Sequence, residues 1–315
     1  MFISEYIKNN YIIDYKFIDS TFEKATKLTK KVVKKFGARG HIQNLYKIKK
    51  VKDACTCSNF DISLRKQIKR CNININNLET RIINAINSSA YDKLAKIDFE
   101  SLNNSVFVGT GGSFAGAKFS SKLINYLYGI NTTVLYPRNL YYRNNNSVDS
   151  VFLFTYSGTT NDLLVSTSLI DNDNKYIITK GELQKIVTKT GISKNNVISY
   201  RTGTNKGKER GFLSFEGALA PASLFLKLYF ENKSKDNIEE FIRDSISYWK
   251  NYFDKYFKEN EKMLKEFLKE GNNFNIFTGD FTESAGSDLE SKIVESGIYN
   301  LSLIHISEPT RLGMI

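Results

Sequence analysis

Two short loops rich in glycine and hydroxyl residues constrain the fold of this chain more than any other feature of its sequence. Loop 1, Gly109-Thr110-Gly111-Gly112-Ser113, follows the apolar residues 106–108. Loop 2, Thr155-Tyr156-Ser157-Gly158-Thr159-Thr160, follows the apolar residues 151–154. Each loop precedes a segment with helical periodicity, and the free N–H groups at the start of a helix attract anions. The pattern predicts two phosphate-binding loops at the carboxyl edge of one parallel sheet.

Strand and helix patterns alternate through the middle of the chain. The apolar runs predict strands at 105–108, 132–136, 150–154, 175–179 and 197–200. The segments between and after them predict helices at 113–128, 160–170, 182–188 and 212–231. Such alternation implies an α/β fold, with a parallel sheet and helices on both faces, because right-handed crossovers place them there.

The same patterns divide the chain into five parts. We expect an N-terminal helical region at 1–100, with helices near 20–36, 61–70 and 75–88, a first α/β unit at 101–232, a helical connector at 233–270, the start of a truncated second unit at 271–300, and a tail at 301–315. In the second unit, residues 274–278 predict a strand and residues 279–286 a loop. Ser287 and Glu290, in capping-box spacing, predict a helix at 287–296 that stops at Gly297.

The tail differs in character from the rest of the chain. Its first eleven residues, Leu-Ser-Leu-Ile-His-Ile-Ser-Glu-Pro-Thr-Arg, resemble the translation of a transposase sequencing adapter. We therefore interpret residues 301–315 as an artefact that stands outside the fold, and we expect the native protein to continue beyond Asn300.

Composition limits the classes of partner. The net charge of +12 suits an anionic ligand, although an AT-rich genome would also enrich lysine. The basic residues 24–39 have apolar positions at helical spacing, which favours an amphipathic helix over a nucleic-acid surface. No apolar run approaches the roughly 20 residues of a membrane helix, so we expect a cytoplasmic protein. Cys55, Cys57 and Cys71 fit no zinc-ligand spacing, and we expect neither a metal nor a cofactor.

With both loops in place, the chain resembles the SIS (sugar isomerase) family. Loop 2 is similar to the family's Ser-x-Ser-Gly-x-Thr motif, with Thr155 in place of the first serine. The segment Glu209-Arg210-Gly211-Phe212-Leu213-Ser214 is similar to the family's entry into the helix beside the sugar. The resemblance covers 104–231 and part of 274–300, and includes tandem members such as the isomerase half of glucosamine-6-phosphate synthase. It implies phosphosugar binding with aldose–ketose isomerase, or aminosugar-phosphate deaminase or deglycase, chemistry.

The resemblance also implies site residues. The expected phosphate- and substrate-binding residues are Gly111, Gly112, Ser113, Thr155, Tyr156, Ser157, Gly158, Thr160, Leu213 and Ser214. Hydroxyls and the backbone N–H groups around Gly158 would hold the phosphate. For Tyr156 two interpretations stand, stacking near the sugar or packing.

Catalysis is expected on the first helix of the second unit. The family's aminosugar isomerases carry a lysine and a glutamate three residues apart there, and Lys292 and Glu295 match that spacing. Glu290 is a second candidate, although it lies about 140° around the helix from Glu295. The alternative is a solvated ion pair. The family's catalytic histidine would lie beyond Asn300, so we expect this truncated chain to be inactive.

Two functions stay open at this level, beside a weaker third, a nucleic-acid binder acting through the basic residues 24–39. The first is a phosphosugar isomerase or deaminase, and the second is a non-catalytic SIS sensor that binds a phosphosugar and regulates a partner. Related proteins pair, so we expect a homodimer.

Overall fold

A sheet of five parallel strands organises the computed structural model. The structure describes residues 70–142, 148–170, 174–201, 209, 214–267, 273–296 and 300–305, all within the compact unit Ile68–Ile315. The strand order is β2-β1-β3-β4-β5. The strands are β1 Asn104–Val108, β2 Asn131–Leu135, β3 Ser150–Thr155, β4 Lys175–Thr179 and β5 Val197–Ser199. All five predicted strands are confirmed, with ends that differ by one residue at most.

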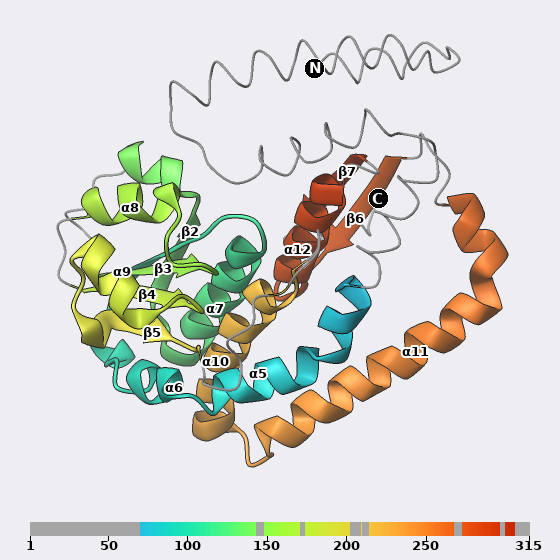
Figure 1. Cartoon of the computed structure of the whole chain (residues 1–315), viewed down its shortest axis with the longest axis horizontal. Helices are drawn as coiled ribbons and strands as arrows, with labels where there is room; N and C mark the ends of the chain where they lie inside the picture. Colours follow the sequence, from blue (N-terminus) through green and yellow to red (C-terminus); the bar gives the residue numbers. More distant parts are fainter. Residues whose placement is uncertain are drawn as a thin grey trace, which may run out of the picture. The chain divides into compact units, whose positions relative to one another are not determined.

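Helices cover both faces of this sheet, as the alternating pattern predicts (Figure 1). Phe107 and Phe152 pack against α7 and α10 on one face, where their rings stack with centroids 4.8 Å apart. Val106 and Val151 pack against α8 and α9 on the other. The helices are α7 Gly112–Tyr128, α8 Asn161–Ser168, α9 Leu183–Thr190 and α10 Glu216–Lys233, with short 3₁₀ turns η1 Phe99–Ser101, η2 Pro137–Tyr142 and η4 Lys194–Asn196. The chain therefore has the predicted α/β architecture.

Two helices before the sheet complete the first face. Helix α5, Leu78–Ile86, confirms the helix predicted near 75–88, and α6, Ser89–Leu94, follows it. Ala85, Tyr91 and Leu94 join the same core as α7 and α10. The helix predicted at 20–36 lies outside the described residues, as does the helix predicted at 61–70 except for its last residue, which is helical.

After the sheet, one long helix leads to a second strand–helix unit. Helix α11, Ile238–Phe267, departs from helical geometry at Asn260 and falls within the predicted connector. Strand β6, Asn273–Thr278, follows, and then α12, Thr282–Ser296. The prediction of a loop over residues 279–286 was wrong, because α12 begins at Thr282.

Hydrogen bonds explain the early start of α12. The Gly279 N–H donates to Thr282 Oγ1 over 2.9 Å, and the Glu283 N–H donates to the Gly279 carbonyl over 2.9 Å. These bonds close a turn directly after β6, so the helix begins there. Ser287 lies buried inside the helix, where its Oγ accepts a hydrogen bond from Lys118 Nζ. It is therefore not the predicted capping residue.

The tail also departs from expectation. Residues 301–305 were expected to stand outside the fold, yet they belong to β7, Asn300–His305, which pairs in parallel with β6. Leu301 and Leu303 alternate with Ser302 in this segment, and such alternation favours a strand whatever the origin of the residues. The interpretation of the tail as an adapter product stays a prediction.

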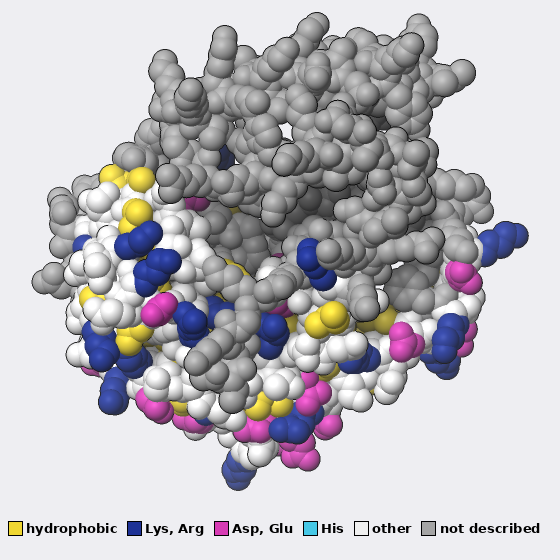
Figure 2. All heavy atoms as spheres, viewed as in Figure 1, with side chains coloured by type: hydrophobic (Ala, Val, Ile, Leu, Met, Phe, Trp, Pro, Cys, Tyr) yellow, Lys and Arg dark blue, Asp and Glu magenta, His cyan; other side chains and the backbone are white. Residues whose placement is uncertain are grey.

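The composition leads to expectations about surface charge and about membrane-spanning helices. On the face shown in Figure 2, Lys and Arg side chains are interspersed with Asp and Glu side chains over the described part of the surface. The basic segment 24–39 lies outside the described residues. None of the helices that the structure describes has both the length and the hydropathy needed to span a membrane.

Candidate functional site at the carboxyl edge of the sheet

The two loops lie next to each other at one edge of the sheet. Strands β1 and β3 are parallel neighbours, with Val108 opposite Leu153. Loop 1 follows the carboxyl end of β1, and loop 2 begins at the last residue of β3. In open α/β sheets this edge is where ligands bind. The predicted convergence of the two loops is therefore present.

Loop 1 makes a tight turn into α7. Gly111 has a φ of 54°, and a Cβ on Gly109 would lie 2.8 Å from the Ser113 carbonyl oxygen. Only glycine fits these two positions without strain. Gly111 has no side chain that could cap α7, and its carbonyl accepts a hydrogen bond from the Phe114 N–H, over 2.9 Å, so no side chain of the N-cap residue covers the first amides of the helix. The start of α7 thus keeps the positive character that favours an anion.

Loop 2 uses its own hydroxyl oxygens as acceptors. The Gly158 N–H donates to Thr155 Oγ1 over 3.3 Å, and the Thr159 N–H donates to Ser157 Oγ over 3.4 Å. Thr160 caps α8 by accepting from the Leu163 N–H over 3.4 Å. These bonds are long, and each hydroxyl retains its own proton for donation. The loop therefore presents several O–H donors on a short stretch of backbone.

The backbone of loop 2 packs closely on neighbouring residues at Gly158 and Ser157. Gly158 has a φ of 66°, and a Cβ there would lie 2.4 Å from Ile186 Cδ1. A Cβ on Gly181 would lie 2.5 Å from the Ser157 carbonyl oxygen. The loop thus rests directly on the segment that joins β4 to α9, and neither glycine leaves room for a side chain.

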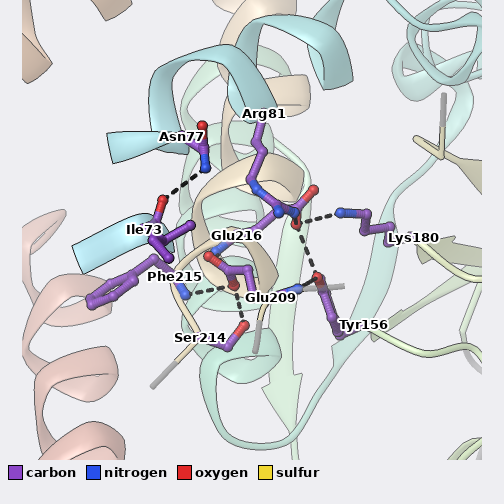
Figure 3. A network of polar contacts seen from close by, with 9 residues as sticks. All are labelled: Ile73, Asn77, Arg81, Tyr156, Lys180, Glu209, Ser214, Phe215 and Glu216. Carbon is purple, nitrogen blue, oxygen red and sulfur yellow. Dashed lines mark hydrogen bonds and ion pairs between the residues drawn. The ribbon is translucent and has the colours of Figure 1, made fainter. Parts of the chain in front are cut away.

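A buried carboxylate joins four parts of the chain behind loop 2 (Figure 3). Glu216, the first residue of α10, is 0% exposed, and its Oε2 lies 2.5 Å from Lys180 Nζ and 2.8 Å from Arg81 Nη1. The hydroxyl of Tyr156 donates to the same oxygen over 2.9 Å. Lys180 directly follows β4, Tyr156 follows β3, and Arg81 belongs to α5. One acceptor therefore links two strand ends and two helices.

Glu209 forms the second carboxylate of this cluster. Its Oε2 accepts from the Ser214 hydroxyl and from the backbone N–H groups of Phe215, over 2.9 Å, and Glu216, over 3.0 Å. These bonds cap the start of α10. Its Oε1 is buried without a hydrogen-bond partner among the described residues. Burial, with the charge of Glu216 adding to it, raises the pKa of Glu209 above its usual value despite the three donors.

The neighbours of Glu216 have shifted pKa values as well. Burial lowers the pKa of Lys180 below its usual value, and pairing with Glu216 offsets only part of this shift. Burial and the nearby Glu216 charge raise the pKa of the Tyr156 hydroxyl. Tyr156 therefore stays protonated and acts as a hydrogen-bond donor across the physiological pH range.

Helix α12 reaches the same edge of the sheet. Lys292 Nζ lies 5.4 Å from the centre of the Phe215 ring, at the start of α10, and 2.5 Å from Asp288 Oδ1. A Cβ on Gly112 would lie 3.3 Å from that same oxygen of Asp288. Lys292 is thus brought between loop 1 and the start of α10, paired with Asp288.

The structure gives fewer contacts for the remaining predicted site residues, and two of them are not described. Ser113 is buried at the start of α7, and Ser214 contacts Glu209 as described above. Glu290 is half-buried on α12, two positions before Lys292 and so on a different side of the helix. Leu213 and the side chain of Glu295 lie outside the described residues.

Sequence reasoning missed the ion-pair cluster. Arg81 and Glu216 lie 135 residues apart, and no local pattern relates them. Two signals were available nonetheless. Lys180 directly follows a predicted strand, and Glu216 is an isolated acidic residue inside the otherwise uncharged segment Phe212-Leu213-Ser214-Phe215-Glu216-Gly217-Ala218.

Three solved structures with a similar fold have names that refer to phosphorylated sugars. The C-terminal domain of glucosamine-fructose-6-phosphate aminotransferase from Francisella tularensis matches with a TM-score of 0.54 and 17% identity, over 76% of this chain and 69% of that chain. A proposed phosphosugar isomerase from Silicibacter pomeroyi DSS-3 matches with a TM-score of 0.58 and 12% identity, over 77% and 74%. Glucosamine-6-phosphate deaminase from Thermotoga maritima matches with a TM-score of 0.52 and 16% identity, over 72% and 69%.

No protein-family model matches the chain, and no curated protein sequence matches it. At identities of 12–17%, the structural similarity bears on the fold alone. The chain has the α/β fold of these three proteins, which confirms the fold implied by its resemblance to the SIS family.

Proposed function

We propose that this chain binds a sugar phosphate at the carboxyl edge of the five-stranded sheet. The observation that carries the proposal is the position of loops 1 and 2 at the ends of the adjacent strands β1 and β3. Ser157 and Thr160 would donate their hydroxyls to the phosphate, and the start of α7 would add its uncapped amides. The descriptions of the structural neighbours support the same ligand class at the level of fold.

We further propose aldose–ketose isomerase or aminosugar-phosphate deaminase chemistry for the protein. Isomerisation needs a base that takes a proton from one carbon of the open sugar and returns it to the next. Glu295 is the proposed base, and Lys292, which lies near loop 1 and Phe215, would stabilise the negative charge that develops on oxygen. The predicted homodimer and cytoplasmic location stay predictions.

Ligand-induced stabilisation tests the binding proposal. Fructose 6-phosphate and glucosamine 6-phosphate should raise the Tm of the chain, whereas fructose and glucosamine should not. Ser157→Ala should reduce the rise. Ser168→Ala is the matched control, because its hydroxyl lies at the far end of α8 and donates to the Val165 carbonyl. No rise with any hexose 6-phosphate, or an equal reduction in both variants, would contradict the proposal.

A comparison of two glutamates on α12 tests the catalytic proposal. In a version of the protein that turns over hexose 6-phosphates, Glu295→Gln should lower kcat by at least about 10²-fold and leave binding unchanged. Glu290→Gln should alter neither. An equal loss of binding and turnover in Glu295→Gln would remove it as the base. Binding without turnover in the unmodified protein would favour the sensor.

A further inference from the structure

Tyr156 occupies the middle of loop 2, but its hydroxyl is engaged behind the loop. It donates to Glu216 Oε2 over 2.9 Å and accepts from the Glu209 N–H over 3.2 Å. Figure 3 shows the side chains of Tyr156 and Lys180 converging on Glu216 from separate elements. The tyrosine hydroxyl is thus a bridge from loop 2 to the start of α10.

The backbone of Tyr156 is held as firmly as its side chain. Its carbonyl oxygen accepts from the Lys180 N–H over 3.3 Å and from Thr179 Oγ1 over 3.4 Å. Lys180 Nζ also lies 5.7 Å from the centre of the tyrosine ring. Backbone, ring and hydroxyl of this one residue therefore all contact the elements beneath loop 2.

Glu216 cannot move without a large energetic cost. It is fully buried, and the Lys180 side chain is only 5% exposed. Displacing the carboxylate would leave the buried Lys180 and the largely buried Arg81 without this partner. Glu216 is therefore a rigid anchor for the Tyr156 hydroxyl.

We infer that Tyr156 is a positioning residue, which sets the conformation of loop 2 through Glu216 and does not contact the sugar. The inference rests on the proposed sugar-phosphate site. The loop's own hydrogen bonds, at 3.3–3.4 Å, are long, and Gly158 alone would permit many backbone conformations. The hydrogen bond to Glu216 restrains Tyr156, which lies between Thr155 and Ser157 in the loop. A preorganised loop binds its ligand more tightly because less ordering is needed on binding.

The chain contains a matched control for this tyrosine. Tyr91, on α6, donates its hydroxyl to Glu231 Oε2 over 2.6 Å, and Glu231 also belongs to α10. Lys227 Nζ lies 4.2 Å from the centre of its ring. Each tyrosine thus donates its hydroxyl to a glutamate of α10 and has a lysine over its ring, but these contacts of Tyr91 are with α10 and not with either loop.

The experiment compares Tyr156→Phe with Tyr91→Phe. Tyr156→Phe removes both hydrogen bonds of the hydroxyl, to Glu216 and from the Glu209 N–H. By isothermal titration with fructose 6-phosphate, it should weaken binding about fivefold to tenfold, a change in the range that lost hydrogen bonds produce. Tyr91→Phe should bind as the unmodified protein does. In the free protein, hydrogen exchange at the amides of residues 157–160 should become faster only in Tyr156→Phe.

A double variant separates direct contact from positioning. If Tyr156 acts through Glu216, Glu216→Gln should weaken binding, and adding Tyr156→Phe should cost less than it does alone. If Glu216→Gln fails to fold, the comparison of hydrogen exchange at residues 157–160 between Tyr156→Phe and Tyr91→Phe still tests the positioning role. Unchanged affinity and exchange in Tyr156→Phe would overturn the inference alone, whereas no hexose 6-phosphate binding by the unmodified protein would overturn the proposed function.

Discussion

In the part of the chain that the structure describes, Glu216 and Glu283 each pair with two cations, and their surroundings differ. Glu216 is fully buried against Lys180 and Arg81 at the carboxyl edge of the sheet. Glu283, on α12, pairs with Lys118 over 2.7 Å and with Lys122 over 3.0 Å, and its side chain is 19% exposed. Both clusters join distant parts of the chain. The comparison separates a buried cluster that fixes a loop from a partly exposed cluster that holds one helix on another.

The difference has a functional meaning under the proposed activity. The Glu216 cluster positions loop 2, which would hold the phosphate. The Glu283 cluster attaches α12 to α7 and so places Lys292 beside loop 1. Rigidity is thus concentrated at the binding residues, while the helix with the proposed catalytic residues is held by bonds that water can reach.

The largest expected effect is on stability. Glu216→Ala leaves the buried Lys180 and the largely buried Arg81 without this partner and should lower the free energy of unfolding by about 3–5 kcal/mol. Glu283→Ala should lower it by only about 1 kcal/mol, because its pairs are partly exposed. Urea denaturation of both variants measures the difference. Equal losses would show that the two clusters are not distinct in kind.

A smaller effect is expected from glycines in the left-handed region. Gly158→Ala places a Cβ 2.4 Å from Ile186 Cδ1 at a φ of 66°, and should cost about 2–4 kcal/mol and most of the ligand affinity. Gly191, at the end of α9, has a φ of 71° but open space around its Cβ position. Gly191→Ala should cost only about 1 kcal/mol and leave ligand binding unchanged. Similar affinity losses in both would contradict the packing described beneath loop 2.

The smallest effect is a pH dependence with opposite signs at two glutamates. The pKa of Glu209 is raised, chiefly by burial, so the folded state binds the Glu209 proton more tightly than the unfolded state does. Protonation of Glu209 therefore stabilises the fold at low pH, and this stabilisation is lost as pH rises through the raised pKa. Burial opposes ionisation of Glu283 too, but hydrogen bonds from Lys118 and Lys122 hold its pKa below the usual value. Its contribution is therefore present above the usual pKa and is lost as pH falls through the lowered one.

Denaturation at several pH values between about 3 and 7 checks these signs. Relative to Glu209→Gln, the unmodified protein should lose stability as the pH rises. Relative to Glu283→Gln, it should gain stability over the same change. Parallel trends for the two substitutions would contradict the contrast between the clusters.

The sequence predicted the parts of this fold that local patterns determine. Apolar runs such as 151–154 identified the strands, and loops 1 and 2 were placed because each directly follows such a run. The start of α12 was misplaced, since Thr282 and Gly279 close a turn that resembles an ordinary loop in sequence. The Glu216 cluster was missed because its partners come together only through tertiary packing.

A crystal structure of the chain with fructose 6-phosphate tests the central claim most directly. The phosphate should lie between loop 2 and the start of α7, within hydrogen-bond distance of the hydroxyls of Ser157 and Thr160, with the Tyr156 hydroxyl still on Glu216. A phosphate bound elsewhere, or no bound ligand at saturating concentration, would contradict the account of this sheet edge as a sugar-phosphate site.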